Sequence, residues 1–65
     1  MLYDYLNEFT AIARTGSLSK ASRELGVSQP ALGRHLSALE TQLGTTLVTR
    51  TAQGIAPTAE GRYLL

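Results

Sequence analysis

Three glycines divide the chain at positions where helices are expected to end. Gly16, Gly26 and Gly44 each follow a segment whose apolar residues recur at helical spacing. Glycine closes helices because it adopts a left-handed backbone conformation without a steric penalty. The apolar positions of the first segment are Leu2, Tyr5, Leu6, Phe9, Ile12 and Ala13, and the inward positions of the second are Leu18, Ala21, Ser22 and Leu25. The sequence therefore predicts a helix before each of these glycines.

Polar residues stand where the second and third helices would begin. Ser17 or Ser19 can cap the second helix, because a side-chain oxygen before a helix accepts a hydrogen bond from a first-turn amide. Ser28 is the expected cap of the third helix, and Pro30 is tolerated there because first-turn amides have no helical acceptor. The third helix is expected to cover about residues 28–43.

A short hairpin is predicted directly after the third helix. The stretch "TLVTR" (46–50) has strand composition, "TAQG" (51–54) is typical of a turn, and "IAP" (55–57) can form a second strand. Pro57 and Thr58 then mark the start of a fourth helix, with Glu60 in its first turn. The expected fold is mainly α, with three core helices, a two-stranded β wing and the start of a C-terminal helix.

Composition limits the classes of function. The chain has 65 residues and no cysteine, and its single histidine, His35, leaves no cluster of zinc ligands. We therefore expect no disulfide, no metal, no cofactor and no catalytic site. The N-terminal stretch lacks the basic start and apolar core of a secretory signal, and the apolar runs are too short to cross a bilayer. These features predict a cytoplasmic protein without a membrane partner.

The third helix has an unusual polar face. At about 100° per residue, Leu32, Leu36, Leu39 and Leu43 form one stripe, which we expect to be buried. The opposite side carries Pro30, Arg34, Ser37 and Thr41, with Gly33 on its flank and Gln29 at the helix start. The Glu and Lys residues of an ordinary solvated face are missing. Small residues beside arginine and glutamine favour close approach to the major groove of DNA, whose base edges these two side chains can bind.

Charge alone does not decide the partner, because the net charge is only +1. Its distribution is uneven: residues 14–37 contain four basic residues against one glutamate, a net +3. This middle segment is either a solvated surface that is locally basic or part of a surface that binds an anionic partner. Two helices joined by a tight turn containing glycine match the helix-turn-helix motif, although any small helical bundle can contain such a pair.

Taken together, these residues resemble the N-terminal winged helix-turn-helix domain of LysR-type bacterial transcriptional regulators. The resemblance covers nearly the whole chain. It rests on the step "GS" (16–17), Ala21 with Leu25, "SQPAL" (28–32), "LE" (39–40), "LG" (43–44), Leu47 with Arg50, and "PTAEG" (57–61).

The resemblance implies sequence-specific binding of double-stranded DNA. It places Gln29, Pro30, Gly33 and Arg34 against bases in the major groove. It also places a second set of residues at the DNA backbone or in the wing: Ser17, Leu18, Lys20, Ser28, Ser37, Arg50 and Gln53. The wing would reach the adjacent minor groove or the backbone.

The resemblance also implies partners and a domain division. Residues 1–57 would form the DNA-binding domain, and residues 58–65 would begin a linker helix that dimerises. The full-length protein would be a homodimer or tetramer on a pseudo-palindromic operator. A small-molecule effector would bind only through a further domain that this chain does not contain.

Three positions depart from the family pattern. Gly33 stands where the family usually has serine or threonine, so one hydroxyl contact is lost. Gln53 replaces an arginine that is common in the wing, which weakens attraction to a narrow minor groove. Val48 stands in place of a common phenylalanine, which we interpret as a variation in packing.

The residues support other interpretations less well. A winged helix can serve only in protein interaction or dimerisation, but such a face should show exposed aromatic or apolar anchors. "SLSK" (17–20) fits a short motif of penicillin-binding enzymes whose companion motifs are absent from this chain. We expect His35 to be partly packed or near a phosphate. Tyr3, Tyr5, Phe9 and Tyr63 could stack on single strands, but helical spacing assigns Tyr5 and Phe9 to the core.

Overall fold

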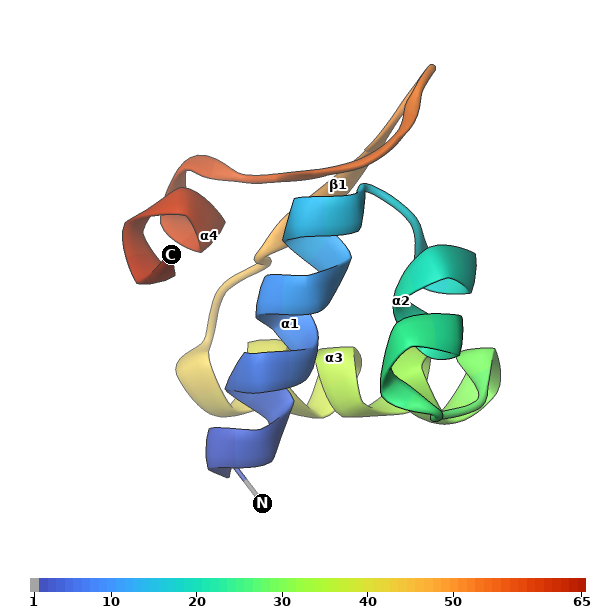
Figure 1. Cartoon of the computed structure of the whole chain (residues 1–65). Coiled ribbons are helices and arrows are strands. Elements are labelled where there is room, and N and C mark those ends of the chain that lie inside the picture. Colours follow the sequence, from blue (N-terminus) through green and yellow to red (C-terminus); the bar gives the residue numbers. More distant parts are fainter. Residues whose placement is uncertain (1) are drawn as a thin grey trace.

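The computed structural model describes residues 2–65, with the side chains of Leu2 and Tyr3 left out of the description. The predicted positions of those two side chains therefore lie outside the described part of the chain. The elements follow in the order α1 (Leu2–Thr15), α2 (Leu18–Leu25), α3 (Gln29–Leu43), β1 (Val48–Thr51), β2 (Gly54–Pro57) and α4 (Ala59–Leu64) (Figure 1). The mainly α, winged helix-turn-helix fold is thus confirmed.

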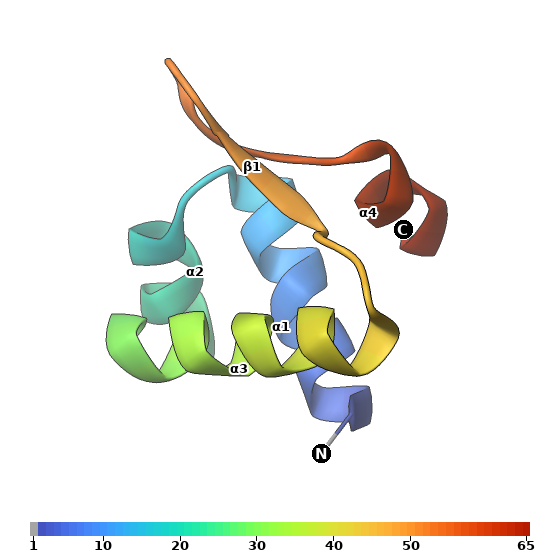
Figure 2. The same ribbon diagram turned by 180° about the vertical axis from the view of Figure 1, so that it is seen from behind.

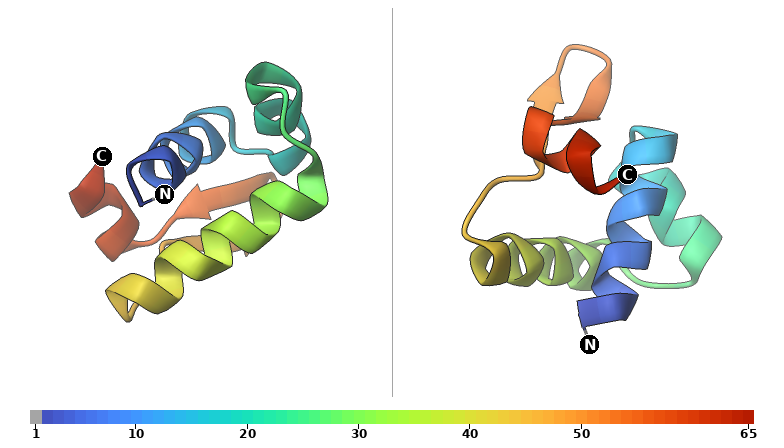
Figure 3. Two further views of the ribbon diagram at one scale, coloured as in Figure 1. Left: turned by 90° about the horizontal axis from the view of Figure 1, so that it is seen from below. Right: turned by 90° about the vertical axis from the view of Figure 1, so that its left-hand side faces the viewer.

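α1 lies at the centre of the arrangement, with α3 crossing its N-terminal and middle part and with the hairpin at its C-terminal end (Figures 1 and 2). α3 lies across α1, and α2 packs beside both (Figure 2). The tip of the hairpin projects on the same side of α1 as α2, whereas α4 and the C-terminus lie on the other side (Figure 1). Figure 3 shows the hairpin standing off from α3, with the connection from α3 running up to it.

The helix boundaries follow from local capping. The Ser17 hydroxyl oxygen accepts a hydrogen bond of 3.1 Å from the Lys20 amide, so Ser17 is the cap of α2 and Ser19 is not. The Ser28 hydroxyl oxygen accepts one of 3.2 Å from the Ala31 amide at the start of α3. At the other ends, Gly26 and Gly44 are left-handed, as predicted. Each cap satisfies an amide or carbonyl that has no partner inside the helix.

The core consists of two adjoining clusters of buried side chains. One contains Ala11, Ile12, Ala21 and Leu32, and the other contains Phe9, Leu39 and Leu47. Phe9 is fully buried, which confirms its assignment to the core. These clusters join α1 to α2 and α3, so burial of apolar surface fixes the helical pair against the first helix.

Two apolar positions predicted to face inward are exposed. Leu43 keeps 43% of its surface, because the last turn of α3 extends past the part of the helix that packs on α1. Leu25 keeps 36%, because α2 ends at this residue and no further turn covers it. Helical spacing gives the direction of a side chain correctly but does not say where the neighbouring helix ends.

The first strand begins later than the sequence pattern predicted, at Val48 and not at Thr46. Leu47 lies just before it and is fully buried, with its amide bonded at 2.7 Å to the Glu40 carboxylate and its carbonyl oxygen accepting at 2.9 Å from the Thr58 amide. Both backbone groups of Leu47 therefore have partners outside the hairpin.

The hairpin is antiparallel and closed by two residues, Ala52 and Gln53, since Thr51 already pairs with Gly54. Its Val48 and Ile55 side chains pack against the core clusters. In addition, the Ile55 amide donates a 3.0 Å hydrogen bond to the carbonyl oxygen of Gly16, which directly follows α1. After β2, the Thr58 hydroxyl caps the predicted fourth helix by accepting from the Gly61 amide at 3.0 Å. Within residues 2–65, no helix combines the length and hydropathy needed to cross a membrane.

Candidate nucleic-acid interface

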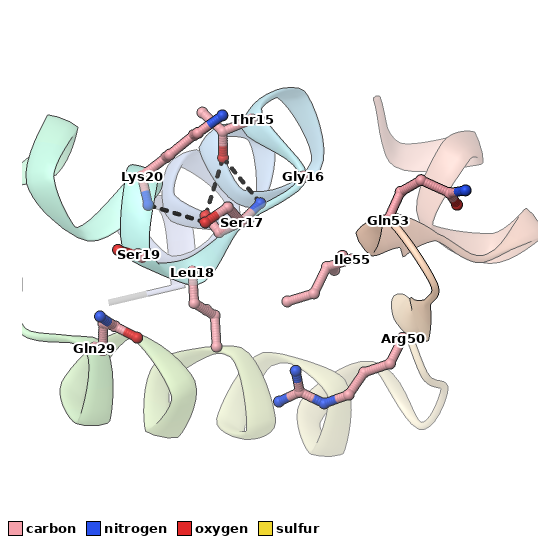
Figure 4. A pocket seen from close by; sticks show the side chains of 11 residues that line it. Thr15, Gly16, Ser17, Leu18, Ser19, Lys20, Gln29, Arg50, Gln53 and Ile55 are labelled. Carbon is pink, nitrogen blue, oxygen red and sulfur yellow. Dashed lines mark hydrogen bonds between the residues drawn. The ribbon is translucent and has the colours of Figure 1, made fainter.

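An open groove of about 540 Å³ lies between the start of α2, the start of α3 and the hairpin (Figure 4). Six of the predicted site residues line it: Ser17, Leu18, Lys20, Gln29, Arg50 and Gln53. Leu18 and Ile55 lie between the two helices and the hairpin and form its apolar floor. Residues from three separate segments of the chain therefore meet in one groove.

Local hydrogen bonds fix the start of α2 at one side of this groove. The Thr15 hydroxyl lies 2.8 Å from the Ala11 carbonyl oxygen and 3.0 Å from the Ser17 carbonyl oxygen, and its one proton is donated to either of them or shared between them, which links the turn to the last turn of α1. Ser17 in turn caps α2 through the Lys20 amide. The positive end of the helix dipole and the exposed Lys20 side chain thus lie at the same edge of the groove, a combination that favours an anion.

A second hollow, of about 330 Å³, follows α3 on the side of the hairpin. Gly33, Ser37 and Arg50 contribute to its lining, and an added Cβ at Gly33 would meet nothing within 4 Å. Figure 4 shows Arg50 extending from the hairpin over α3, whereas Gln53 points away from α3. Arg50 lines both hollows, so its guanidinium is positioned between the helix and the wing.

The remaining predicted site residues lie on the first turns of α3, outside both hollows. Ser28, Pro30 and Arg34 are exposed. The Ser28 hydroxyl already accepts the capping hydrogen bond, so it can offer only its proton to a phosphate. Arg34 lies on the outer face of α3, as the helical spacing predicted.

Positive charge at this surface is not neutralised by neighbouring carboxylates. Among residues 2–65, Lys20, Arg34 and Arg50 form no ion pair. In the described part of the chain, no acidic residue lines the first groove. Glu24 pairs with Arg14 and Glu8 contacts His35, both away from the two hollows. Glu40 lines the second hollow, where its carboxylate accepts from the Leu47 amide. A net charge of +1 is therefore compatible with a distinctly positive groove.

Several residues of the two hollows were not predicted as site residues. Thr15 and Ser19 line the first, Thr49 lines the second, and Ile55 lines both. The sequence indicates Ser19 only as an alternative cap. Ile55 is opposite Arg50 in the hairpin register, a pairing that follows from the position of the predicted turn. Nothing in the sequence pattern singles out Thr15, whose role depends on the bend between α1 and α2.

The aromatic side chains that the structure describes do not gather at this surface. Tyr5 is half-buried and stacks on His35, and Tyr63 is exposed on α4, on the other side of α1. The partial packing predicted for His35 is confirmed. In the part of the chain that the structure describes, no three His, Cys, Asp or Glu side chains are arranged to hold a metal ion.

A groove between a helix-turn-helix unit and a β wing defines a winged helix-turn-helix domain. Residues 3–62 match the lysR family of bacterial regulatory helix-turn-helix proteins. The chain belongs to this family. Its DNA-binding fold is similar to that of the LysR-family transcriptional regulator CbnR, with a TM-score of 0.94 and 40% identity over 100% of this chain and 22% of CbnR.

Two further similarities concern crystal structures of DNA complexes. A complex of the CbnR DNA-binding domain with DNA has a TM-score of 0.91 and 40% identity, covering 100% of this chain and 75% of that one. A complex of the BenM DNA-binding domain with catB site 1 DNA has a TM-score of 0.89 and 33% identity, covering 98% of this chain and 70% of that one.

Relatives in sequence are several times longer than this chain. The HTH-type transcriptional activator AmpR of Rhodobacter capsulatus is 48% identical over 59 residues, which are 91% of this chain and 20% of AmpR. A small neutral protease regulatory protein of Streptomyces coelicolor is 49% identical over 61 residues, which are 94% of this chain and 19% of that protein. The chain thus spans about a fifth of the length of these relatives.

Proposed function

We propose that this chain binds double-stranded DNA with sequence specificity, as the DNA-binding part of a bacterial transcriptional regulator. The observation that carries the proposal is the groove in which Lys20, Gln29 and Arg50 converge beside the outer face of α3. Two similar domains, those of CbnR and BenM, have been crystallised with DNA. The exposed face of α3 carries no aromatic or large apolar anchor before its last turn, which disfavours a surface used only for protein interaction.

In this proposal α3 enters the major groove. Gln29, Pro30, Gly33 and Arg34 face the base edges, where glutamine can bind adenine and arginine can bind guanine through two hydrogen bonds each. A second set of residues meets the backbone, and this set is Ser17, Leu18, Lys20, Ser28, Ser37 and Arg50. Gln53 at the tip of the wing reaches the minor groove or its edge. Phosphate contacts set the register, while the base contacts determine the sequence.

We further propose a division at residue 57 and association of two copies on DNA. Residues 58–65 would begin a linker helix, and the exposed apolar side chains Leu43, Tyr63 and Leu64 line a groove of about 260 Å³ that a second copy could cover. In the whole protein, a small-molecule effector would act through a separate domain. Such a regulator would work in the cytoplasm, where bacterial DNA is located, and would not act as an enzyme.

Selection from random DNA tests this proposal. The chain is mixed with duplexes of randomised sequence at two salt concentrations, and the bound pool is sequenced. We expect enrichment of a palindrome whose half-sites are about one or two helical turns apart. Weak binding that disappears with salt and enriches no sequence would count against specific recognition and favour the protein-interaction alternative.

Arg34→Ala should weaken binding to the selected duplex by about 1 to 3 kcal/mol and relax the preference at one base pair. The reason is that arginine distinguishes guanine through two hydrogen bonds that alanine cannot make. Fluorescence anisotropy with duplexes mutated at each position measures this effect. Arg23→Ala is the matched control, because Arg23 is also an exposed arginine but belongs to α2 and not to the outer face of α3. Unchanged preferences in Arg34→Ala would remove Arg34 from the set of base contacts.

Lys20→Ala should weaken binding to all sequences alike. It should also reduce the slope of log K against log salt concentration by about 1, since one phosphate contact is lost. Titrations at four salt concentrations with the selected and with an unrelated duplex measure both quantities. Arg23→Ala, which removes the same charge from the same helix, should leave the slope nearly unchanged. Equal slopes for the two variants would move Lys20 off the interface.

A further inference from the structure

A polar contact joins α1 to the recognition helix α3 away from the proposed DNA-binding face. The Nδ1 atom of His35 lies 2.8 Å from the Glu8 carboxylate, and the His35 ring stacks on Tyr5 with centroids 4.5 Å apart and planes inclined by 11°. The contact is sheltered, with 29% of the His35 side chain and 14% of the Glu8 side chain exposed. His35 directly follows Arg34 in α3.

This contact restricts the rotation of α3 about its own axis more strongly than apolar packing alone does. The rest of the α1–α3 interface consists of core side chains, such as Ile12 and Leu32 in one cluster and Phe9 and Leu39 in the other. Burial of apolar surface has no directional preference. A hydrogen bond depends on both distance and angle, and stacking restricts the plane of a ring. Together they add directional restraints on the rotation of α3 about its own axis to those of the packed core.

Small rotations of α3 would disturb base recognition. A rotation of about 10° moves an atom at the outer radius of a helix, roughly 6 Å from the axis, by about 1 Å. Such a displacement exceeds the tolerance of a hydrogen bond to a base edge. Arg34 is one residue from His35, so the direction of its side chain depends directly on the orientation that Glu8 and Tyr5 impose.

We propose that Glu8 and Tyr5 are positioning residues for base recognition: through His35 they hold α3 in the rotation that directs Arg34 at its base pair. They touch no DNA themselves. This inference rests on the proposed DNA-binding function and assigns to α1 a part in its sequence specificity.

The test compares Glu8→Ala with Glu8→Gln, which keeps an oxygen acceptor for the His35 ring. The measured quantity is the specificity ratio, defined as the Kd for the duplex altered at the Arg34 base pair divided by the Kd for the selected duplex. We expect Glu8→Ala to lower this ratio by about fivefold to tenfold and Glu8→Gln to change it by less than about twofold. Circular dichroism at the temperature of the binding experiment establishes that each variant is folded.

A double-mutant cycle with Arg34→Ala separates positioning from general destabilisation. If Glu8 acts through Arg34, then Glu8→Ala should have no further effect on the ratio in the Arg34→Ala background. A ratio unchanged by Glu8→Ala, or reduced equally in both backgrounds, would overturn the inference. If Glu8→Ala is unfolded, Tyr5→Leu with Tyr5→Phe as its control replaces it in the same cycle, with the same two outcomes. A wild-type ratio near one would instead refute the proposed function itself.

Discussion

Gly54→Ala should lower the free energy of unfolding by about 3 kcal/mol, which is most of the stability expected of a domain this small. Gly54 has φ of 137°, in the region that residues with a Cβ rarely adopt. An added Cβ would also lie 2.5 Å from the Gly16 carbonyl oxygen, well inside van der Waals contact. Urea denaturation followed by circular dichroism measures the loss.

The added Cβ would collide with the Gly16 carbonyl oxygen, which also accepts a hydrogen bond. The Gly16 carbonyl oxygen accepts the hydrogen bond from the Ile55 amide that attaches the hairpin to α1. Displacing it would loosen the wing and, one residue further on, the Ser17 cap of α2. We therefore expect Gly54→Ala to reduce DNA affinity even where the protein remains folded, because the groove depends on both segments.

Gly33→Ala is the matched control, because an added Cβ at Gly33 would meet nothing within 4 Å and the residue lies inside α3. Alanine has a higher helix propensity than glycine, so this variant should gain about 0.5 to 1 kcal/mol in free energy of unfolding. Gly33→Ala and Gly54→Ala should thus shift the urea midpoint in opposite directions. If the midpoint of Gly54→Ala stayed at the wild-type value, the close contact with Gly16 would be wrong.

The parts of the fold that the sequence predicts well are set by local chemistry. A capping hydroxyl and the amide that it satisfies lie within a few residues of each other, and a left-handed glycine directly follows its helix. Ser28, Gly26 and Gly44 could therefore be assigned without tertiary information, whereas the structure was needed to choose Ser17 over Ser19 as the cap of α2. Burial at Leu43 could not be assigned in this way, since it depends on how far α1 extends along α3. The position of Leu47 outside the first strand was not predicted for a similar reason. Its hydrogen-bond partners, Glu40 and Thr58, lie in different parts of the chain.

In the candidate site too, the residues set by local geometry were predictable and those set by tertiary contacts were not. Helical geometry alone placed Arg34 and Ser37 on the outer face of α3. Arg50 and Gln53 were predicted only through the family resemblance, because the position of the hairpin relative to the helices depends on the contact between Ile55 and Gly16. Charge counting underestimated the site, since a formal charge of +1 includes glutamates that are occupied away from the groove. The location of each charge, and not its sum, decides whether a phosphate is attracted.

Gly61→Ala should lower the free energy of unfolding by about 2 to 3 kcal/mol. Gly61 is buried in α4, and an added Cβ would lie 2.2 Å from the Leu47 carbonyl oxygen and 3.2 Å from the ring of Phe9. Leu47 cannot retreat easily, because its amide is held by Glu40 and its carbonyl oxygen by the Thr58 amide. The helix must move instead, which breaks the bond to Thr58 and exposes Leu47 and Phe9.

Two measurements separate this effect from simple fraying of the chain end. Urea denaturation gives the total loss, and hydrogen exchange at the amides of residues 59–64 reports whether α4 detaches first. Tyr63→Ala is the control on the same helix, since Tyr63 is 91% exposed and its removal should change stability by less than about 0.5 kcal/mol. If the amides of α4 lose protection in Gly61→Ala while those of α1 keep it, then α4 detaches on its own. That result would show that the close contact with Leu47 holds α4 to the rest of the domain. Wild-type stability in Gly61→Ala would contradict that contact.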